Sequence, residues 1–156
     1  MINPSPTHGQ TTLPFILFEL AGTTYGILSH QVQQIEMIDK ITPVPNALPF
    51  VEGVVFCRSQ VIPALNLRTR LGFEKKNYDL LTRLIVIQIQ TNQTEESDRR
   101  VGLIVDSARE FIAIPQTLIG PPPEGLSNTP SQYLSSIITL ENRVILILDL
   151  EKIIET

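Results

Sequence analysis

The sequence predicts a mostly β protein made of two similar small barrels that pack side by side. Short strand-like apolar runs dominate the 156 residues, and glycines and prolines interrupt them. Two stretches about half a chain apart also repeat one another. A β unit of ~70 residues is marginal in the apolar area that it can bury alone. We therefore expect the two halves to share an apolar seam and to fold as one cooperative unit.

The repeat runs without a gap through the clearest strand pair of each half. Residues 53–67 read GVVFCRSQVIPALNL, residues 136–150 read SIITLENRVILILDL, and their apolar positions match. Asn66 falls opposite Asp149 at the end of this unit. Earlier segments match too, 15–20 with 84–89 and 25–27 with 101–103. The spacing of the copies differs because loops tolerate changes in length.

The first half begins with a predicted hairpin. Residues 15–20 and 23–28 are strand-like, and Ala21-Gly22 between them suits a tight turn. Ser29 is expected to cap a brief helix, in which Val32 and Ile35 would lie three apart on one face. Pro43, Pro45 and Pro49 exclude a continuous helix in the next stretch.

The remaining elements follow from the same signals. Residues 54–57 and 61–65 are expected to pair about the polar turn 58–60, and Pro63 favours an edge position or a bulge. Further strands are predicted over 84–89, 101–105, 133–140 and 144–148, with an exposed loop over 91–100, an extended connector at 121–123 and a closing helix over 150–154.

Composition excludes several classes of protein. The net charge is −4, and tryptophan is absent, so the chain lacks the basic surface and the aromatic platforms that nucleic acids require. Apolar runs are far shorter than the ~20 residues of a membrane span, and the polar N-terminus does not resemble a secretion signal. We expect a cytoplasmic protein without direct membrane insertion. Cys57 is the single cysteine, so no internal disulfide can form.

Several segments together resemble the CheW family of chemotaxis adaptors. The main one is VPNALPFVEGVVFCRSQVIPALNLRTRLG (44–72), and the others are FILFELAGTTYGI (15–27), VGLIVDSARE (101–110), IGPPPEG (119–125) and RVILILDLEKII (143–154). The resemblance implies two intertwined five-stranded SH3-like β-barrels with a hydrophobic seam. It also implies that residues 15–154 form one domain of two pseudo-repeated halves, with residues 1–14 as a flexible tail.

The resemblance also implies a function without catalysis. Members of the family are scaffolds that bind the cytoplasmic tip of a chemoreceptor and the regulatory domain of a CheA-type histidine kinase. A related pathway of twitching motility or phototaxis remains an alternative to flagellar chemotaxis. Neither a cofactor nor a metal is expected.

The resemblance places Val32, Gln34, Ile35 and Arg58 on the receptor-facing side, while no residue can be assigned to the kinase surface. The sequence departs from the family pattern nearby. The usual Leu-Arg-Gly is Cys57-Arg58-Ser59, the usual acid of Val-x-Glu-Ile is Gln34, and the usual aspartate of the later strand is Asn66. If position 59 needs a positive φ, serine costs about 1 kcal/mol more than glycine.

A small hydrolase is the alternative from another class. Asp106 and Asp149 each follow an apolar strand and could act as a general acid and base. We favour structural roles for both, because Asn66 occupies the position equivalent to Asp149 and a short polar side chain there can bond nearby backbone N–H groups. His8, His30 and Cys57 lie in no recognisable catalytic or metal-binding motif.

Overall fold

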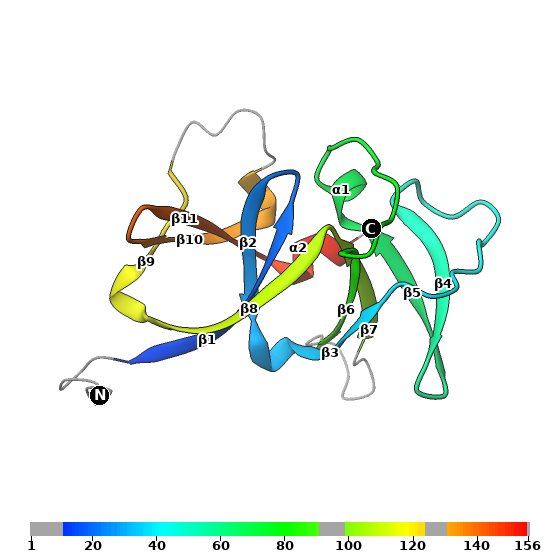
Figure 1. The fold of residues 1–156 in the computed structure, drawn as a ribbon, viewed down its shortest axis with the longest axis horizontal. Coiled ribbons are helices and arrows are strands. Elements are labelled where there is room, and N and C mark those ends of the chain that lie inside the picture. The colour runs from blue at the N-terminus through cyan, green and yellow to red at the C-terminus, as the bar shows by residue number, and fades with distance from the viewer. Residues whose placement is uncertain (1–10, 91–98, 124–130, 156) are drawn as a thin grey trace.

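Two β-sheets, each drawing strands from both halves of the chain, make up the protein (Figure 1). The computed structural model describes residues 11–90, 99–123 and 131–155. The six-stranded sheet has the order β8-β1-β2-β11-β10-β9, and the five-stranded sheet has the order β3-β6-β7-β5-β4. The strands are β1 (Thr12–Leu20), β2 (Thr23–Leu28), β3 (Val32–Met37), β4 (Val51–Cys57), β5 (Gln60–Asn66), β6 (Arg83–Ile89), β7 (Arg99–Val105), β8 (Ser107–Pro115), β9 (Ile119–Gly120), β10 (Leu134–Leu140) and β11 (Arg143–Leu148). Two short helices, α1 (Leu67–Arg70) and α2 (Leu150–Ile154), follow β5 and β11, and 3-10 turns lie at Ser29–Gln31, Gln116–Leu118 and Ser131–Tyr133.

The halves are intertwined, as predicted. Hairpin β1–β2 from the start of the chain pairs with hairpin β10–β11 from its end, and the middle hairpins β4–β5 and β6–β7 pair with each other. In each sheet the two hairpins join through one parallel strand pair, with Ile147 opposite Gly26 in one sheet and Ala64 opposite Gly102 in the other. The mostly β class and the repeat are therefore confirmed.

Closed five-stranded barrels are not what the backbone forms. One sheet has six strands because the two-residue β9 joins its edge, and in both sheets the first and last strands of the order are not paired with each other among the described residues. The five-stranded sheet instead brings its edge strands β3 and β4 into contact through side chains, since the Gln34 amide reaches Cys57.

The helix predicted after Ser29 is wrong. A single 3-10 turn, Ser29–Gln31, leads directly into β3, which pairs with β6. The register shifts between Val32 and Gln34, so Gln33 is an extra residue in the strand. Val32 lies opposite Ile87 and Ile35 opposite Ile85, and these two β6 residues belong to one core cluster. Val32 and Ile35 do share a face, but a β-bulge rather than a helix puts them there.

Three other features refine or correct what the sequence predicts. The strand β5 that contains Pro63 is internal, but its parallel register with β7 begins only at Ala64, so proline stands where β5 has one neighbour. Strand β8 was not predicted. The predicted tail is shorter than 1–14, because Thr12 already pairs with Pro115, while residues 1–10 lie outside the described residues. Residues 91–98 of the predicted exposed loop also lie outside them.

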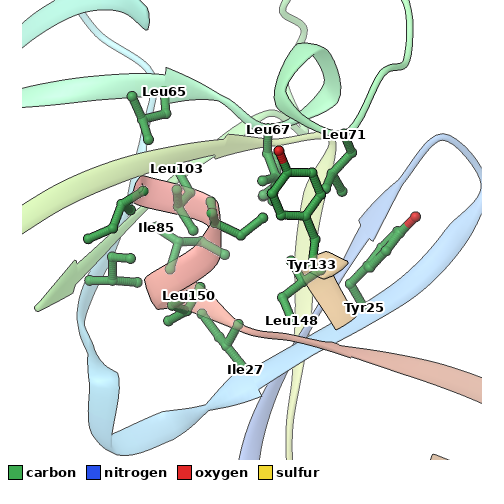
Figure 2. Close-up of a cluster of buried hydrophobic side chains, with 14 of the residues drawn as sticks. Tyr25, Ile27, Leu65, Leu67, Leu71, Ile85, Leu103, Tyr133, Leu148 and Leu150 are labelled. Carbon is green, nitrogen blue, oxygen red and sulfur yellow. The ribbon is translucent and has the colours of Figure 1, made fainter. Parts of the chain in front are cut away.

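The main hydrophobic core occupies the seam between the two sheets (Figure 2). Strand β6 shows how the seam forms. Its residues Ile85 and Ile87 face the seam, while Leu84 and Val86 face a second, smaller core within the five-stranded sheet. A strand buried on both faces has no polar alternation, which explains its continuous apolar sequence. The labelled seam residues come from both halves: Tyr25, Ile27, Leu65, Leu67, Leu71, Ile85, Leu103, Tyr133, Leu148 and Leu150.

Arg70 connects the two halves at their helices. Its guanidinium lies over the rings of Phe50 and Tyr133, 4.3 and 5.0 Å from their centroids. It donates hydrogen bonds to the backbone carbonyls of Ile153, Lys152 and Glu155 at the end of α2. A helix end has carbonyls without intrahelical partners, and here a side chain from the other half of the chain satisfies them.

Gly102 allows the close approach of β7 and β6, and its replacement tests this packing. A Cβ at this position would lie 2.6 Å from Cδ1 and 3.0 Å from Cγ of the buried Leu84. We expect Gly102→Ala to lower the free energy of unfolding by about 1–3 kcal/mol through overpacking. Urea denaturation measures this. Gly120→Ala is the control, because nothing lies within 4 Å of its Cβ position; equal stability of the two variants would contradict the account.

Candidate functional site

Arg58 stands in the two-residue turn that joins β4 to β5. Cys57 pairs with Gln60, and both turn residues have positive φ, 48° at Arg58 and 68° at Ser59. Such paired left-handed residues match the twist of a hairpin but suit glycine or asparagine better. Serine at position 59 therefore carries the strain anticipated from the sequence, and the turn presents the Arg58 side chain to solvent.

The edge strand β3 approaches the end of this hairpin with its polar face. The Gln34 amide Nε2 donates to Cys57 Sγ at 2.8 Å and also to the Glu36 carboxylate. The Cys57 thiol in turn lies 3.7 Å from Glu36 Oε2. Gln34, Glu36 and Cys57 thus form a small polar cluster that connects β3 to β4, with Arg58 as the next residue along the chain.

The Cys57 thiol is a poor nucleophile in this environment. Burial raises the pKa of Cys57, and the negative charge and hydrogen bond of Glu36 raise it further, while Arg58 and Arg100 act in the opposite direction. A thiol that is buried and protonated at neutral pH is inert. Cys57 therefore has a packing and hydrogen-bonding role between the edge strands β3 and β4.

The structure brings together two of the four predicted receptor-facing residues. Gln34 contacts Cys57, the residue before Arg58, whereas Val32 and Ile35 lie on the opposite, seam-facing side of β3. Val32 packs against the core, and Ile35 is 40% exposed.

Sequence reasoning missed three residues near this site. Glu36 was overlooked because it follows the motif that drew attention to Gln34. Phe56 and Val61, paired across the hairpin, are 74% and 64% exposed. Their alternation with buried Val55 and Ile62 was visible in the sequence, but the side that faces water was not.

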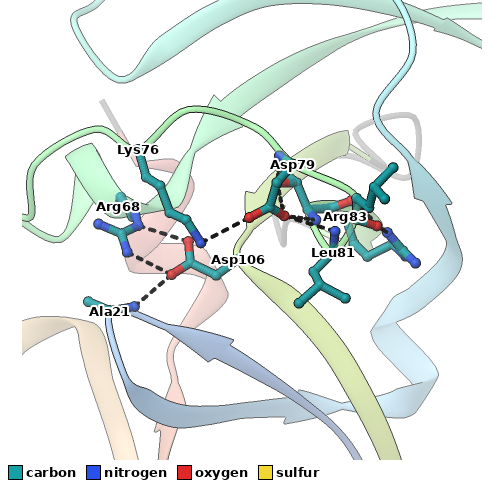
Figure 3. Close-up of polar contacts among 9 residues, drawn as sticks. Ala21, Arg68, Lys76, Asp79, Leu81, Arg83 and Asp106 are labelled. Atoms are coloured by element: carbon teal, nitrogen blue, oxygen red, sulfur yellow. Dashed lines mark hydrogen bonds and ion pairs between the residues drawn. The ribbon is translucent and has the colours of Figure 1, made fainter.

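Asp106 has a structural role. Figure 3 shows its carboxylate between Arg68, which donates two hydrogen bonds of 2.8 and 2.7 Å, and the backbone N–H of Ala21 at 2.9 Å. Burial by itself would raise the pKa of Asp106, but these hydrogen bonds and the charges of Arg68 and Lys76 hold it below its ordinary value. Asp106, from the second half of the chain, thereby connects the β1–β2 turn and α1, which both belong to the first half.

Asp149 is a helix cap. Its carboxylate accepts a hydrogen bond from the Lys152 N–H at the start of α2, as the Asn66 side chain does from the Thr69 N–H at α1. The repeat had predicted this equivalence. Both acids of the alternative hydrolase therefore have structural partners.

Within residues 11–90, 99–123 and 131–155, no three His, Cys, Asp or Glu side chains gather closely enough to hold a metal ion. No helix in that part of the chain is long and apolar enough to cross a membrane.

Two interlocked β-sheets that share one hydrophobic seam define the class of the protein as mostly β. Comparison with known proteins gives its family. The family model for the CheW-like domain matches residues 14–156. The chain therefore belongs to the CheW-like family of chemotaxis adaptors.

Individual relatives agree with this assignment. The chain is 32% identical over 146 residues to the chemotaxis protein CheW of Bacillus subtilis, covering 94% of this chain and 89% of that one. It is 28% identical over 142 residues to CheW of Klebsiella aerogenes, covering 91% and 81%. The crystal structure of the scaffolding protein TtCheW from Thermoanaerobacter tengcongensis superposes with a TM-score of 0.83 at 27% identity, covering 93% of this chain and 94% of that one.

The role of Asp106 predicts a pH dependence of stability. A carboxyl group whose pKa is lower in the folded protein stabilises the fold above its unfolded pKa of about 3.9, and this contribution is lost as the pH falls through the folded value. We expect Asp106→Asn to lower the free energy of unfolding at pH 7 by about 1–3 kcal/mol and to flatten the loss of stability below about pH 4.

Urea denaturation between pH 2.5 and 7 measures both effects. The control is Glu110→Gln, which removes an ion pair to Arg143 whose side chains are both 41% exposed. An exposed pair contributes about 0–1 kcal/mol. Equal losses in the two variants, or an unchanged acid limb in Asp106→Asn, would contradict the structural role.

Proposed function

We propose that this chain couples chemoreceptors to a CheA-type histidine kinase in the cytoplasm, as a scaffold without catalytic activity of its own. The receptor tip would bind the rim of the five-stranded sheet, formed by Gln34 on β3 and by Arg58 in the β4–β5 turn. Of the other two residues predicted for this surface, Ile35 would contribute from the opposite face of β3, where it is 40% exposed, whereas Val32 packs against the core. The regulatory domain of the kinase would bind elsewhere on the module, so that both partners are held at once.

The turn at Arg58 is the observation that carries the proposal. Two successive non-glycine residues with positive φ are unfavourable, and such strain persists where the surrounding structure or function requires it. The turn holds an exposed arginine beside the exposed Phe56–Val61 pair. Arginine next to apolar surface is typical of residues that dominate protein interfaces.

The contacts of the other acids support a scaffold rather than an enzyme. Asp106 is held by an ion pair and Asp149 caps a helix, so both have structural work that explains their positions. Cys57 is buried and its pKa is raised. Structural roles therefore explain Asp106, Asp149 and Cys57 better than catalysis by a hydrolase would.

The substitution Arg58→Glu tests the receptor-binding rim. An exposed charge reversal changes stability by less than about 0.5 kcal/mol, while at a docked interface it weakens binding by ~2 kcal/mol or more, because like charges meet and a donor is lost. We expect affinity for a receptor tip to fall by about 30-fold or more with an unchanged melting temperature. Receptor-dependent activation of the kinase should fall in parallel, measured by phosphotransfer in a reconstituted mixture.

Glu141→Arg is the matched control, since Glu141 occupies the equivalent turn position of hairpin β10–β11 and also has a positive φ, 55°. It should leave receptor affinity within about twofold. Unchanged receptor affinity in Arg58→Glu, or a large drop in its melting temperature, would remove Arg58 from the binding site. Phosphotransfer or hydrolysis by the purified chain alone would contradict the scaffold role.

A further inference from the structure

Glu36 belongs to the rim but was not among the residues expected there. Its register opposite Leu84 directs the side chain to the same face of β3 as Gln34, toward the end of hairpin β4–β5. Hydrogen bonds from the Gln34 amide and the Cys57 thiol orient the carboxylate there. Glu36 is exposed, so an oriented anion lies at the surface of the rim.

No ion pair within the described residues holds this anion. Cys57 contacts the Glu36 carboxylate, and Arg58 follows Cys57 in the hairpin turn, so one anion and one cation lie on either side of this cysteine. Arg100 donates a hydrogen bond to Gln60. In the part of the chain that the structure describes, no ion pair reaches either Glu36 or Arg58.

In the second half of the chain, Glu110 occupies the position equivalent to Gln34 but makes a different contact. Gln34 lies opposite Val86 next to a bulge in β3, and Glu110 lies opposite Leu17 next to a bulge in β8. Glu110 forms an ion pair of 3.1 Å with Arg143 of hairpin β10–β11, so that its charge is compensated within the chain. In the five-stranded sheet the contact to the hairpin is the neutral Gln34–Cys57 hydrogen bond, and the Glu36 carboxylate lies two residues later, with no ion pair among the described residues.

We propose that Glu36 is a specificity-determining residue of the rim, which binds a basic side chain of the receptor tip while Arg58 binds an acidic one. This inference rests on the proposed receptor-binding function. The partner it fits is a receptor segment with a basic and an acidic side chain on one face. A receptor with two acidic side chains there would meet Glu36 with like charge, and such mismatches exclude wrong partners.

Titration of Glu36→Gln against the purified cytoplasmic tip of a chemoreceptor from the same organism tests the proposal. Glutamine keeps an acceptor for the Gln34 and Cys57 hydrogen bonds and removes the charge. We expect affinity to fall by about 5- to 10-fold, and the dependence of affinity on salt concentration to become shallower. Asp39→Asn is the matched control, because it removes one exposed acid from the same segment; it should change affinity less than about twofold.

Reaction of the single cysteine, Cys57, with an aromatic disulfide reagent tests whether the rim itself is intact. Glu36→Gln should react somewhat faster than the parent chain, because the pKa of Cys57 loses the contribution of the Glu36 charge, but far more slowly than the unfolded chain, because Cys57 stays buried and keeps its contact with Gln34. Unchanged affinity in Glu36→Gln overturns the proposal, and so does a loss of affinity that comes with rapid thiol reaction or with unchanged salt dependence, because Glu36 would then only hold the rim together.

Titration of Arg58→Glu in the same series distinguishes a failure of the Glu36 role from a failure of the proposed receptor binding. Loss of affinity in Arg58→Glu with none in Glu36→Gln overturns the role of Glu36 and leaves the proposed function standing. Absence of binding by the parent chain, or full binding by Arg58→Glu, overturns the receptor-binding rim itself.

Discussion

The parallel pairing of strands from opposite halves of the chain is the constraint on which the rest of the structure depends. Gly26 and Gly102 stand at the two equivalent crossings, opposite Ile147 and Ala64. A Cβ at Gly26 would lie 2.9 Å from Ile147 Cδ1. Because each sheet is completed by the other half, the seam core, the Arg70 contacts to α2 and the Arg68–Asp106 pair all join residues that are distant in sequence.

The rim around Arg58 is a consequence of how the five-stranded sheet ends. Its edge strands β3 and β4 are brought together by side chains instead of a backbone ladder, so the polar groups that connect them lie at the surface. A continuous ladder would have satisfied the same edges with main-chain groups common to every sequence. Closure by side chains makes the chemistry of this region depend on the residues at positions 34, 36 and 57.

The repeat allowed much of the fold to be predicted, and its failures have physical causes. It correctly assigned Asn66 and Asp149 to the same capping position. It did not reveal β8, because Arg109 and Glu110 interrupt the apolar pattern at the point where the strand bulges. The three-residue spacing of Val32 and Ile35 is typical of a helix, yet a bulge at Gln33 produces the same spacing in a strand. The position of Glu36 depends on that bulge and on the approach of a distant hairpin, which no local pattern contains.

The exchange of hairpins also has a consequence for the order in which the protein can be made. Hairpin β1–β2 is synthesised long before the strand that pairs with β2 from the other half, β11, which ends at Leu148. Phe18, Leu20, Tyr25 and Ile27 therefore lack part of their native core until β11 has been made. Until then the growing chain depends on remaining soluble with part of this apolar surface uncovered.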